Sequence, residues 1–491
     1  MTIQQLTKRF RFAQQAPTGD HHQEHRLRGN LGPLYLLFTV FSYNAPLAAV
    51  VTLLPITIGY GNGIGAPMAY IGAAILAALF AVGFLKMARH VKNPGGFYSF
   101  VSVGLGREVG LGASFLAFIC YYLLMLGAYT YMGIAVRDLV TDMFHGPAIS
   151  WWVWTLVLLL VVAVLGYMKL DVSARVLTWL LAAETVVVIV HDVLVVAHGG
   201  AEGLTSNSLL PSNIFSGSIG LALLFAMLCM SGFEATVIFR DETRDPDRTI
   251  PRAVYGFIAV AGVLYSVTAW AVIVGLGEST AVATIAADPT RTFMQTTQMY
   301  MGTVGVHVVI VLLNTSLLAS ILATHNVLSR YAFNLGVDGI LPRRLGNVHR
   351  VQGSPHVASI AVSVASLLGV LPVIVFHAAP EIVYAQFAGA FGYALILLLM
   401  VTNIAIAVYL IRKRPEGAGV WHRMIAPGLT FVGLGVTLYL ATTNIDLLIT
   451  AGDGVVASLL GTLYGVVVAG ILLAIVLKRR RPDTYARIGR Q

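Results

Sequence analysis

Residues 219–234 read IGLALLFAMLCMSGFE, and the last four of them decide how the rest of the chain is interpreted. The first twelve residues are almost entirely apolar, as in a helix that crosses a membrane. Gly232 then lets the backbone leave helical geometry at little cost. Glu234 follows as an ionisable group at the depth of the hydrocarbon core, where such a residue marks a functional site by default.

A second stretch, residues 42–47, reads SYNAPL and carries a break of the same kind in another apolar run. Pro46 lacks a backbone N–H and disfavours helix at Ala45. Ser42 and Asn44 place polar side chains beside the break. A proline kink and an isolated helical glycine would explain either feature alone, but in corresponding positions they predict two discontinuous helices that meet near the membrane midplane.

The composition excludes a soluble globular protein and a disordered chain. Of the 491 residues, 57% are hydrophobic and only 11% are charged, against roughly 25% charged in soluble proteins, and disordered chains are poor in apolar residues. The two cysteines, Cys120 and Cys229, lie in apolar runs and exclude a disulfide scaffold. The chain therefore reads as an all-α integral membrane protein, without the alternating segments of a membrane barrel.

Twelve apolar runs are long enough to cross a bilayer as helices. They cover residues 33–57, 67–88, 109–136, 150–167, 172–197, 213–239, 252–276, 301–333, 356–377, 382–411, 422–444 and 454–477.

The basic residues indicate the orientation of these spans. With twelve spans, 29 of the 31 Lys and Arg residues fall on one side, and only Arg137 and Arg291 fall on the other. Cytoplasmic loops carry the excess of Lys and Arg, so we expect both termini in the cytoplasm and the protein in the cell membrane. The net charge of +9 then predicts contact with anionic lipid rather than with nucleic acid.

Three motifs resemble those of the amino acid–polyamine–organocation permeases. The first begins at Ser231-Gly232-Phe233-Glu234 and continues through residues 241–253, DETRDPDRTIPRA. The second is RYAFNLGVDGILP at 330–342, and the third is NPGGFY at 93–98. All three fall where the family has them in a twelve-span chain, so the resemblance covers nearly the whole length.

The resemblance implies a LeuT-like fold of two inverted five-helix repeats followed by two further helices. The expected division of the chain is a cytoplasmic tail at 1–30, the first repeat at 31–200, the inverted second repeat at 201–414, the last two spans at 415–478 and a cytoplasmic tail at 479–491.

The resemblance also implies alternating-access transport of amino acids or related amines across the cytoplasmic membrane, coupled to protons or operating by exchange. It implies no enzymatic activity and no cofactor, and the family includes both monomers and homodimers. An exchanger without proton coupling, a channel and a nutrient sensor remain as alternatives. A channel would need a continuous polar stripe, whereas the polar residues cluster mid-membrane.

The candidate substrate-binding residues are those at the two breaks, together with one residue each from spans 3 and 8. They are Ser42, Tyr43, Asn44, Ala45, Pro46, Ser231, Gly232, Phe233, Glu234, Tyr122 and Thr315, with Tyr121, Tyr129, Asn314, Ser316 and Ser320 as weaker candidates. Free N–H groups at a half-helix N-terminus attract an anion such as a carboxylate, and free carbonyls can face an ammonium group. Many family members have G-x-G in span 1, which this chain lacks.

Only two carboxyls, those of Glu184 and Glu234, are expected deep in the apolar runs. The resemblance places Glu184 where a Lys or Glu often does the work of a sodium ion, so we expect it to couple transport to protons. A hydrogen-bonded structural role and direct contact with a cationic substrate remain open for it. Glu234 either binds the substrate ammonium group or stabilises the break in span 6.

The stretch GYGNGIGA at residues 59–66 superficially matches a dinucleotide-binding fingerprint. That fingerprint requires a preceding strand and a βαβ unit, and here it joins two apolar runs. We expect a tight outer loop there.

Overall fold

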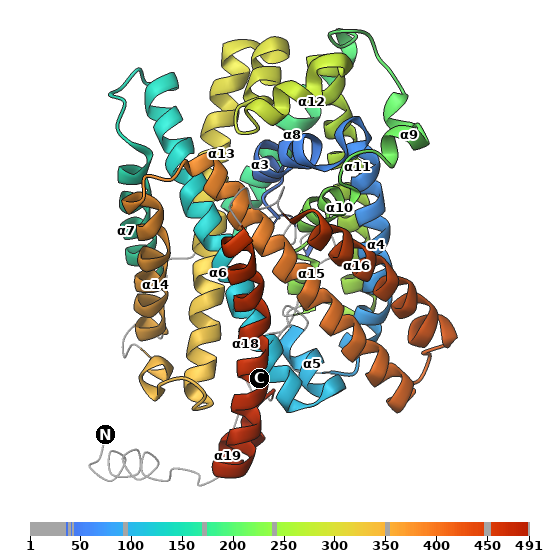
Figure 1. The fold of residues 1–491 in the computed structure, drawn as a ribbon, viewed down its shortest axis with the longest axis vertical. Helices are drawn as coiled ribbons and strands as arrows, with labels where there is room; N and C mark the ends of the chain where they lie inside the picture. Colours follow the sequence, from blue (N-terminus) through green and yellow to red (C-terminus); the bar gives the residue numbers. More distant parts are fainter. Residues whose placement is uncertain are drawn as a thin grey trace, which may run out of the picture.

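The computed structural model describes residues 36–37, 41, 44–91, 97–168, 174–237, 243–348, 354–445 and 453–489. All regular secondary structure in these ranges is helical, with no β-strand (Figure 1). Helices suit a membrane because they pair their backbone polar groups internally, where no water is available. The expectation of an all-α protein is confirmed for this part of the chain.

The α-helices follow one another along the chain as a set of long rods with a few short connecting helices (Figure 1). They are α3 (Pro46–Ile56), α4 (Ala66–Ala88), α5 (Phe97–Leu105), α6 (Arg107–Asp138), α7 (Trp151–Tyr167), α8 (Ala174–Ala197), α9 (Pro211–Ile214), α10 (Ile219–Leu228), α11 (Pro246–Leu276), α12 (Glu278–Ala287), α13 (Thr292–Val337), α14 (His356–Val375), α15 (Pro380–Lys413), α16 (Ala426–Thr443), α18 (Asp453–Arg480) and α19 (Pro482–Arg487).

Shorter 3-10 and π-helical turns connect or extend these helices. They are η1 (Thr57–Asn62), η2 (Gly63–Gly65), η3 (Leu139–Met143), η4 (Asn207–Leu209), η5 (Phe233–Val237), η7 (Arg343–Gly346) and η8 (Trp421–Ile425).

Nine helical segments of the described chain are long and apolar enough to cross a membrane. One of them, Pro46–Ala88, joins two of the predicted spans through η1 and η2, and α7 and α10 are shorter apolar helices. Every predicted apolar run overlaps a helix. The chain is therefore a multi-pass membrane protein.

The helix α13 is two helices joined at Gly302, whose φ of 68° lies in the left-handed region. Glycine adopts this conformation without steric cost. The predicted span at 301–333 therefore corresponds to the part of α13 after the kink. In Figure 1, α9 and α12 lie at one end of the bundle, and α5 and α19 lie at the other.

The stretch at 59–66 is a tight, kinked connection between α3 and α4, with non-helical backbone at Gly61 and Gly63. It forms the end of η1, all of η2 and the first residue of α4. The glycines are needed for close approach: a Cβ on Gly61 would lie 2.9 Å from the Ala222 side chain, and one on Gly65 would lie 2.2 Å from the Asn213 carbonyl oxygen. The connection therefore packs closely against α9 and α10.

The helix α6 lies in the middle of the bundle and packs against α5, α7, α13, α15 and α18. Its crossing with α18 is very close, because a Cβ on Gly470 would lie 2.7 Å from the Cα atom of Gly112. Small residues allow such approach in membranes, where packing rather than the hydrophobic effect holds helices together. This crossing anchors the last long helix to the centre of the fold.

Gly470→Ala should lower the thermal stability of the protein, because overpacking a close contact costs about 1–3 kcal/mol. The matched control is Gly465→Ala on the same helix, where a Cβ would meet no atom within 4 Å. The control should keep or slightly raise the apparent melting temperature of the purified protein in detergent. Equal melting temperatures for the two variants would contradict the close crossing.

Candidate functional site between two broken helices

The first break lies at Ala45, where the sequence predicts it. Ala45 has φ 48° and ψ 73°, in the left-handed region, and α3 begins at the next residue, Pro46. Phe41 and Asn44 before the break are helical. Proline is well suited to a first helical position because the N–H that it lacks would have no partner there.

The second break follows α10, which ends at Leu228. The backbone then turns, Gly232 adopts a φ of 104°, and the 3-10 helix η5 begins at Phe233. The glycine that the sequence singles out is therefore the residue that reverses the backbone. Ser231 donates its hydroxyl proton to the Leu228 carbonyl at 2.6 Å and so closes the end of α10.

Asn44 joins the two breaks. Its Nδ2 donates to the carbonyl oxygens of Cys229, at 2.6 Å, and Ser231, at 3.0 Å. Its Oδ1 accepts a hydrogen bond from the Tyr265 hydroxyl on α11 at 2.6 Å. One amide side chain thus supplies partners for carbonyls that the break in span 6 has released, and an unpaired buried carbonyl would be costly.

At each break, a glutamate carboxylate bonds a backbone amide at the start of the helix that follows. Glu184 Oε2 on α8 accepts from the Leu47 backbone N–H at the start of α3, at 3.4 Å, and Ser316 on α13 also bonds this carboxylate. Glu234 Oε2 accepts from the Gly232 N–H at 2.8 Å. These amides carry the partial positive charge of a helix start. The protein's own carboxylates already bind them, so they are not free to bind a substrate anion.

A cavity of about 110 Å³ lies beside the two breaks. Because one water needs roughly 10–15 Å³ of such space, the cavity suits a small molecule. It is lined by Asn44, Ala45, Ala48, Ala49, Thr52, Leu53, Leu123, Leu124, Gly127, Ala128, Tyr131, Leu228, Ser231, Leu317, Ser320, Tyr384, Ala388 and Phe391. This lining, drawn from the described residues, contains no Asp, Glu, Lys, Arg or His.

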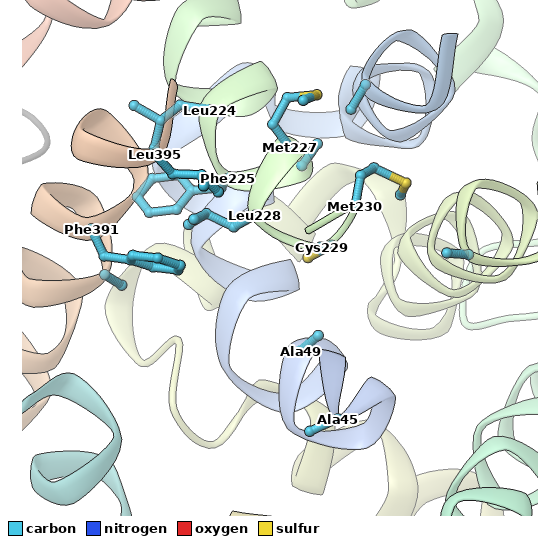
Figure 2. Close-up of a cluster of buried hydrophobic side chains, with 14 of the residues drawn as sticks. Ala45, Ala49, Leu224, Phe225, Met227, Leu228, Cys229, Met230, Phe391 and Leu395 are labelled. Carbon is cyan, nitrogen blue, oxygen red and sulfur yellow. The ribbon is translucent and has the colours of Figure 1, made fainter. Parts of the chain in front are cut away.

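Aromatic rings form one wall of the cavity. The Tyr131 and Tyr384 ring centroids, on α6 and α15, are 4.8 Å apart. Figure 2 shows Phe391 on α15 beside Leu228 at the end of α10, with Ala45, which precedes α3, and Ala49 of α3 below Cys229. Aromatic faces attract cations.

Helix ends of both kinds lie at the cavity. Asn44 and Leu228 line it and each closes the C-terminal end of a helical segment, whereas Ala45 and Ala48 belong to the start of α3. A helix C-terminus carries partial negative charge and a helix N-terminus partial positive charge. At the start of α3, the Leu47 amide is already bonded to the Glu184 carboxylate.

The structure brings three of the predicted substrate-binding residues to the cavity, namely Asn44, Ala45 and Ser231, together with the weaker candidate Ser320. Pro46, Gly232 and Glu234 shape the breaks without lining the cavity. Ser42 and Tyr43 lie outside the described residues.

The other predicted residues face elsewhere. Thr315 is exposed and bonds carbonyls of its own helix, at Val311 and Leu312. Tyr122 donates to the Ala365 carbonyl on α14 at 2.6 Å.

Phe233 is also directed away from the cavity, since it packs in an aromatic cluster with Phe80 and Phe84. Of the weaker candidates, Tyr121 bonds Glu234, Asn314 donates to the Ala135 carbonyl, and Tyr129 is buried outside the cavity lining.

Sequence reasoning missed Tyr131, Tyr384 and Phe391. On α6 the inward face repeats every three to four residues, at Leu123–Leu124, Gly127–Ala128 and Tyr131, as expected for one helical stripe. The small pair at 127–128 was the signal that could have identified this stripe.

The expectation that only Glu184 and Glu234 carry deep carboxyls is wrong. Asp192 lies on α8 within the predicted span 172–197, and it is only 5% exposed. It is paired with the fully buried His191. Sequence reasoning passed over it because the pair lies near the end of the apolar run, where exposure to the aqueous phase is the default.

A bundle of apolar helices with a small internal cavity between two broken helices is the arrangement of many membrane transporters. The sequence model of the amino acid permease family matches residues 48–484, so the chain belongs to this family. This confirms the resemblance that the three motifs indicate. The family and its relatives make the protein a transporter of amino acids or amines rather than an enzyme.

Several curated relatives are similar over much of their length. A probable GABA permease of Pseudomonas aeruginosa is 25% identical over 379 residues, which cover 74% of this chain and 76% of the relative. The low-affinity putrescine importer PlaP of Escherichia coli is 24% identical over 318 residues, 62% of this chain and 66% of the relative. An uncharacterized transporter of Mycobacterium tuberculosis is 24% identical over 236 residues, 41% and 47% of the two chains.

Asn44→Ala should destabilise the protein more than Tyr265→Phe. The first change leaves two carbonyls and one hydroxyl without their partner, whereas the second removes a single hydrogen bond, and each unsatisfied buried group costs about 1–3 kcal/mol. Apparent melting temperatures in detergent measure the difference. Equal losses in the two variants would mean that Asn44 does not hold the two breaks together.

Proposed function

We propose that this protein is a secondary transporter that carries small organic ammonium compounds across the cytoplasmic membrane by alternating access, driven by protons. One observation carries the choice of substrate. The Leu47 amide at the start of α3 is bonded to Glu184, and the Gly232 amide just before η5 is bonded to Glu234. Neither break offers these amides to a substrate carboxylate. The described cavity lining contains hydroxyl and aromatic side chains and no charged one, which suits an ammonium group.

The relatives support this chemistry. Their names specify GABA for one and putrescine for the other, and both compounds carry a primary ammonium group on a four-carbon chain. They differ at the other end, which is a carboxylate in GABA and a second ammonium group in putrescine. The occupied N-terminal amides favour the diamine or a monoamine for this chain.

The proposed architecture has twelve spans in a LeuT-like arrangement, with repeats at 31–200 and 201–414 and both termini in the cytoplasm. The positions of the breaks support it: one lies in the first helix of each proposed repeat, and Asn44 ties them together. Two inverted repeats that rock about a fixed midplane site provide alternating access.

Glu184 is the proposed coupling residue. Its carboxylate bonds the first turn of α3, whose residues Ala48, Ala49 and Thr52 line the cavity. Protonation removes the negative charge and weakens the bond to the Leu47 amide, so α3 is free to shift. A proton on Glu184 therefore acts on the cavity wall without touching the substrate, and this favours coupling over direct substrate contact.

Glu234 is proposed to stabilise the second break rather than to bind the substrate. Its carboxylate caps its own turn at Gly232 and is bonded by Tyr121 on α6. It does not line the cavity.

Glu184→Gln should abolish the pH dependence of uptake in proteoliposomes, because the amide cannot take up a proton in this pH range. Substrate counterflow, which needs no net proton movement, should persist. Glu416→Gln removes an exposed carboxylate and is the control with wild-type pH dependence. Unchanged pH-driven accumulation by Glu184→Gln would remove the coupling role and favour an exchanger without proton coupling.

Butylamine, putrescine and GABA share a four-carbon chain and differ at one end, so they test the substrate class directly. Butylamine and putrescine should raise the melting temperature of the purified protein and compete with labelled putrescine in counterflow, and GABA should do neither at the same concentration. A neutral isostere such as pentanol controls for apolar binding. Stronger binding of GABA than of putrescine would overturn the proposed preference for amines.

A further inference from the structure

Four buried side chains from three helices form a hydrogen-bonded cluster outside the cavity. His191 Nδ1 lies 3.0 Å from Asp192 Oδ1, both on α8. The Thr268 hydroxyl on α11 donates to Asp192 Oδ2 at 2.6 Å. His191 Nε2 lies 3.0 Å from the Thr296 hydroxyl on α13. Nothing in the proposed transport site uses this cluster.

The cluster is fully hydrogen-bonded in two protonation states, which differ by one proton. With a neutral imidazole, Nδ1–H donates to the Asp192 carboxylate and Nε2 accepts from the Thr296 hydroxyl. With one proton more, Nε2–H donates to the Thr296 oxygen, and the Thr296 hydroxyl turns to the Phe293 carbonyl, 3.1 Å away. Rotation of one hydroxyl therefore accommodates the added proton.

A cluster that only joined helices would not need to be fully hydrogen-bonded in two protonation states. A buried His–Asp pair is costly to bring out of water, and neutral hydroxyl or amide groups would connect α8, α11 and α13 at lower cost. Ionisable residues inside a membrane helix mark proton or substrate paths in general. The second hydrogen-bonding state at Thr296 is what a site that binds and releases a proton requires.

The position of the pair along α8 relates it to Glu184. Seven residues separate Glu184 from His191, so both lie on one face of the helix, two turns and about 10 Å apart. On α11, Thr268 faces the pair, and Tyr265, one turn away, interacts electrostatically with Glu184 and bonds Asn44. Polar groups on α8 and α11 therefore lie at intervals between the cluster and the break in span 1.

The elements packed against the pair bring few ionisable groups to it. Among the described residues, α13 contributes Thr296 and the Phe293 ring, 4.6 Å from the imidazole. α11 contributes Thr268, and α3 meets α8 at Glu184.

The nearest ionisable groups lie further along the helices in both directions. They are Glu184 and Tyr265 toward the cavity, and His198, which contacts Tyr300, toward the end of α8. In the proposed orientation, this end of α8, together with α9 and α12 (Figure 1), faces outward.

We propose that the His191–Asp192 pair is a second proton-binding site, which passes protons between the outer aqueous phase and Glu184. The proposal rests on the proton coupling proposed above. One proton moves: it comes from water outside, is held between His191 and Asp192, and passes about 10 Å along α8 to the Glu184 carboxylate. In the proposed orientation the pair lies on the outer side of Glu184, so it loads Glu184 from that side of the membrane.

The test compares driven uptake with counterflow in proteoliposomes that contain the full-length protein and labelled putrescine. A gradient of one pH unit drives at most about tenfold accumulation per coupled proton. His191→Gln should lose this accumulation and the putrescine-induced proton entry, reported by a trapped pH-sensitive dye, while keeping counterflow. His325→Gln is the matched control, because His325 is also fully buried but bonds Ser359 rather than a carboxylate, and it should accumulate putrescine as the wild type does.

The outcomes separate this inference from the proposed function. A wild type that shows no proton-driven uptake overturns both. If both the wild type and His191→Gln accumulate putrescine in response to the pH gradient, the second proton site is overturned and the proposed function stands. If His191→Gln does not fold, as judged by lost counterflow, Asp192→Asn carries the same expectation.

A third variant gives an independent readout. Thr296→Val keeps the His–Asp pair but removes the hydroxyl that serves both protonation states. It should shift the pH at which uptake is half-maximal, and an unchanged pH profile would overturn the proposal.

Discussion

The backbone groups released where two helices break must find partners inside a membrane, and the rest of the site depends on how they do so. No water is available there to satisfy a free carbonyl or amide. Asn44 takes two carbonyls of the second break, Glu184 takes an amide of the first, and Glu234 takes an amide of the second. Three polar side chains thus stabilise two interrupted helices, whereas continuous helices would pair these backbone groups without any side chain.

The same three side chains set the electrostatics of the cavity. Glu184 and Glu234 each bond one backbone amide, that of Leu47 and that of Gly232, and so reduce the positive charge at these helix starts. The carboxylates stay out of the cavity lining. In the proposed function, a cation in the cavity contacts aromatic rings and hydroxyls. Protonation of Glu184 acts on this cation through a shift of α3, which lines the cavity. Binding and coupling are therefore separate in space but share one helix.

Much of the fold could be predicted because the length of each apolar run can be read directly along the sequence. The apolar runs, the break at Ala45 and the turn at Gly232 follow from residue types and spacing alone, and the structure has helices and breaks there. The site was harder to predict. Thr315 and Tyr122 have suitable chemistry but face away from the cavity, because a helix that is apolar all round does not reveal which side faces inward.

Other features required the packing itself. The glycines at 61 and 65 predicted a tight connection, but only the structure shows what it packs against, namely Ala222 and Asn213. The Asp192–His191 pair is buried between helices that supply threonine hydroxyls: Thr268 on α11 bonds Asp192, and Thr296 on α13 bonds His191. Neither threonine is near the pair in the sequence.

The sequence by itself determined that the chain is a multi-helix membrane protein, where its helices are interrupted and to which family it belongs. These properties depend on local composition and on motifs that each lie within one segment. The tertiary structure decided which side chains meet: that Asn44 bridges the breaks, that Glu184 lies on the start of α3 and that Tyr131, Tyr384 and Phe391 form the cavity wall. The physical reason is that the rotation of each apolar helix about its own axis is set by its neighbours, so only packing decides what faces the cavity.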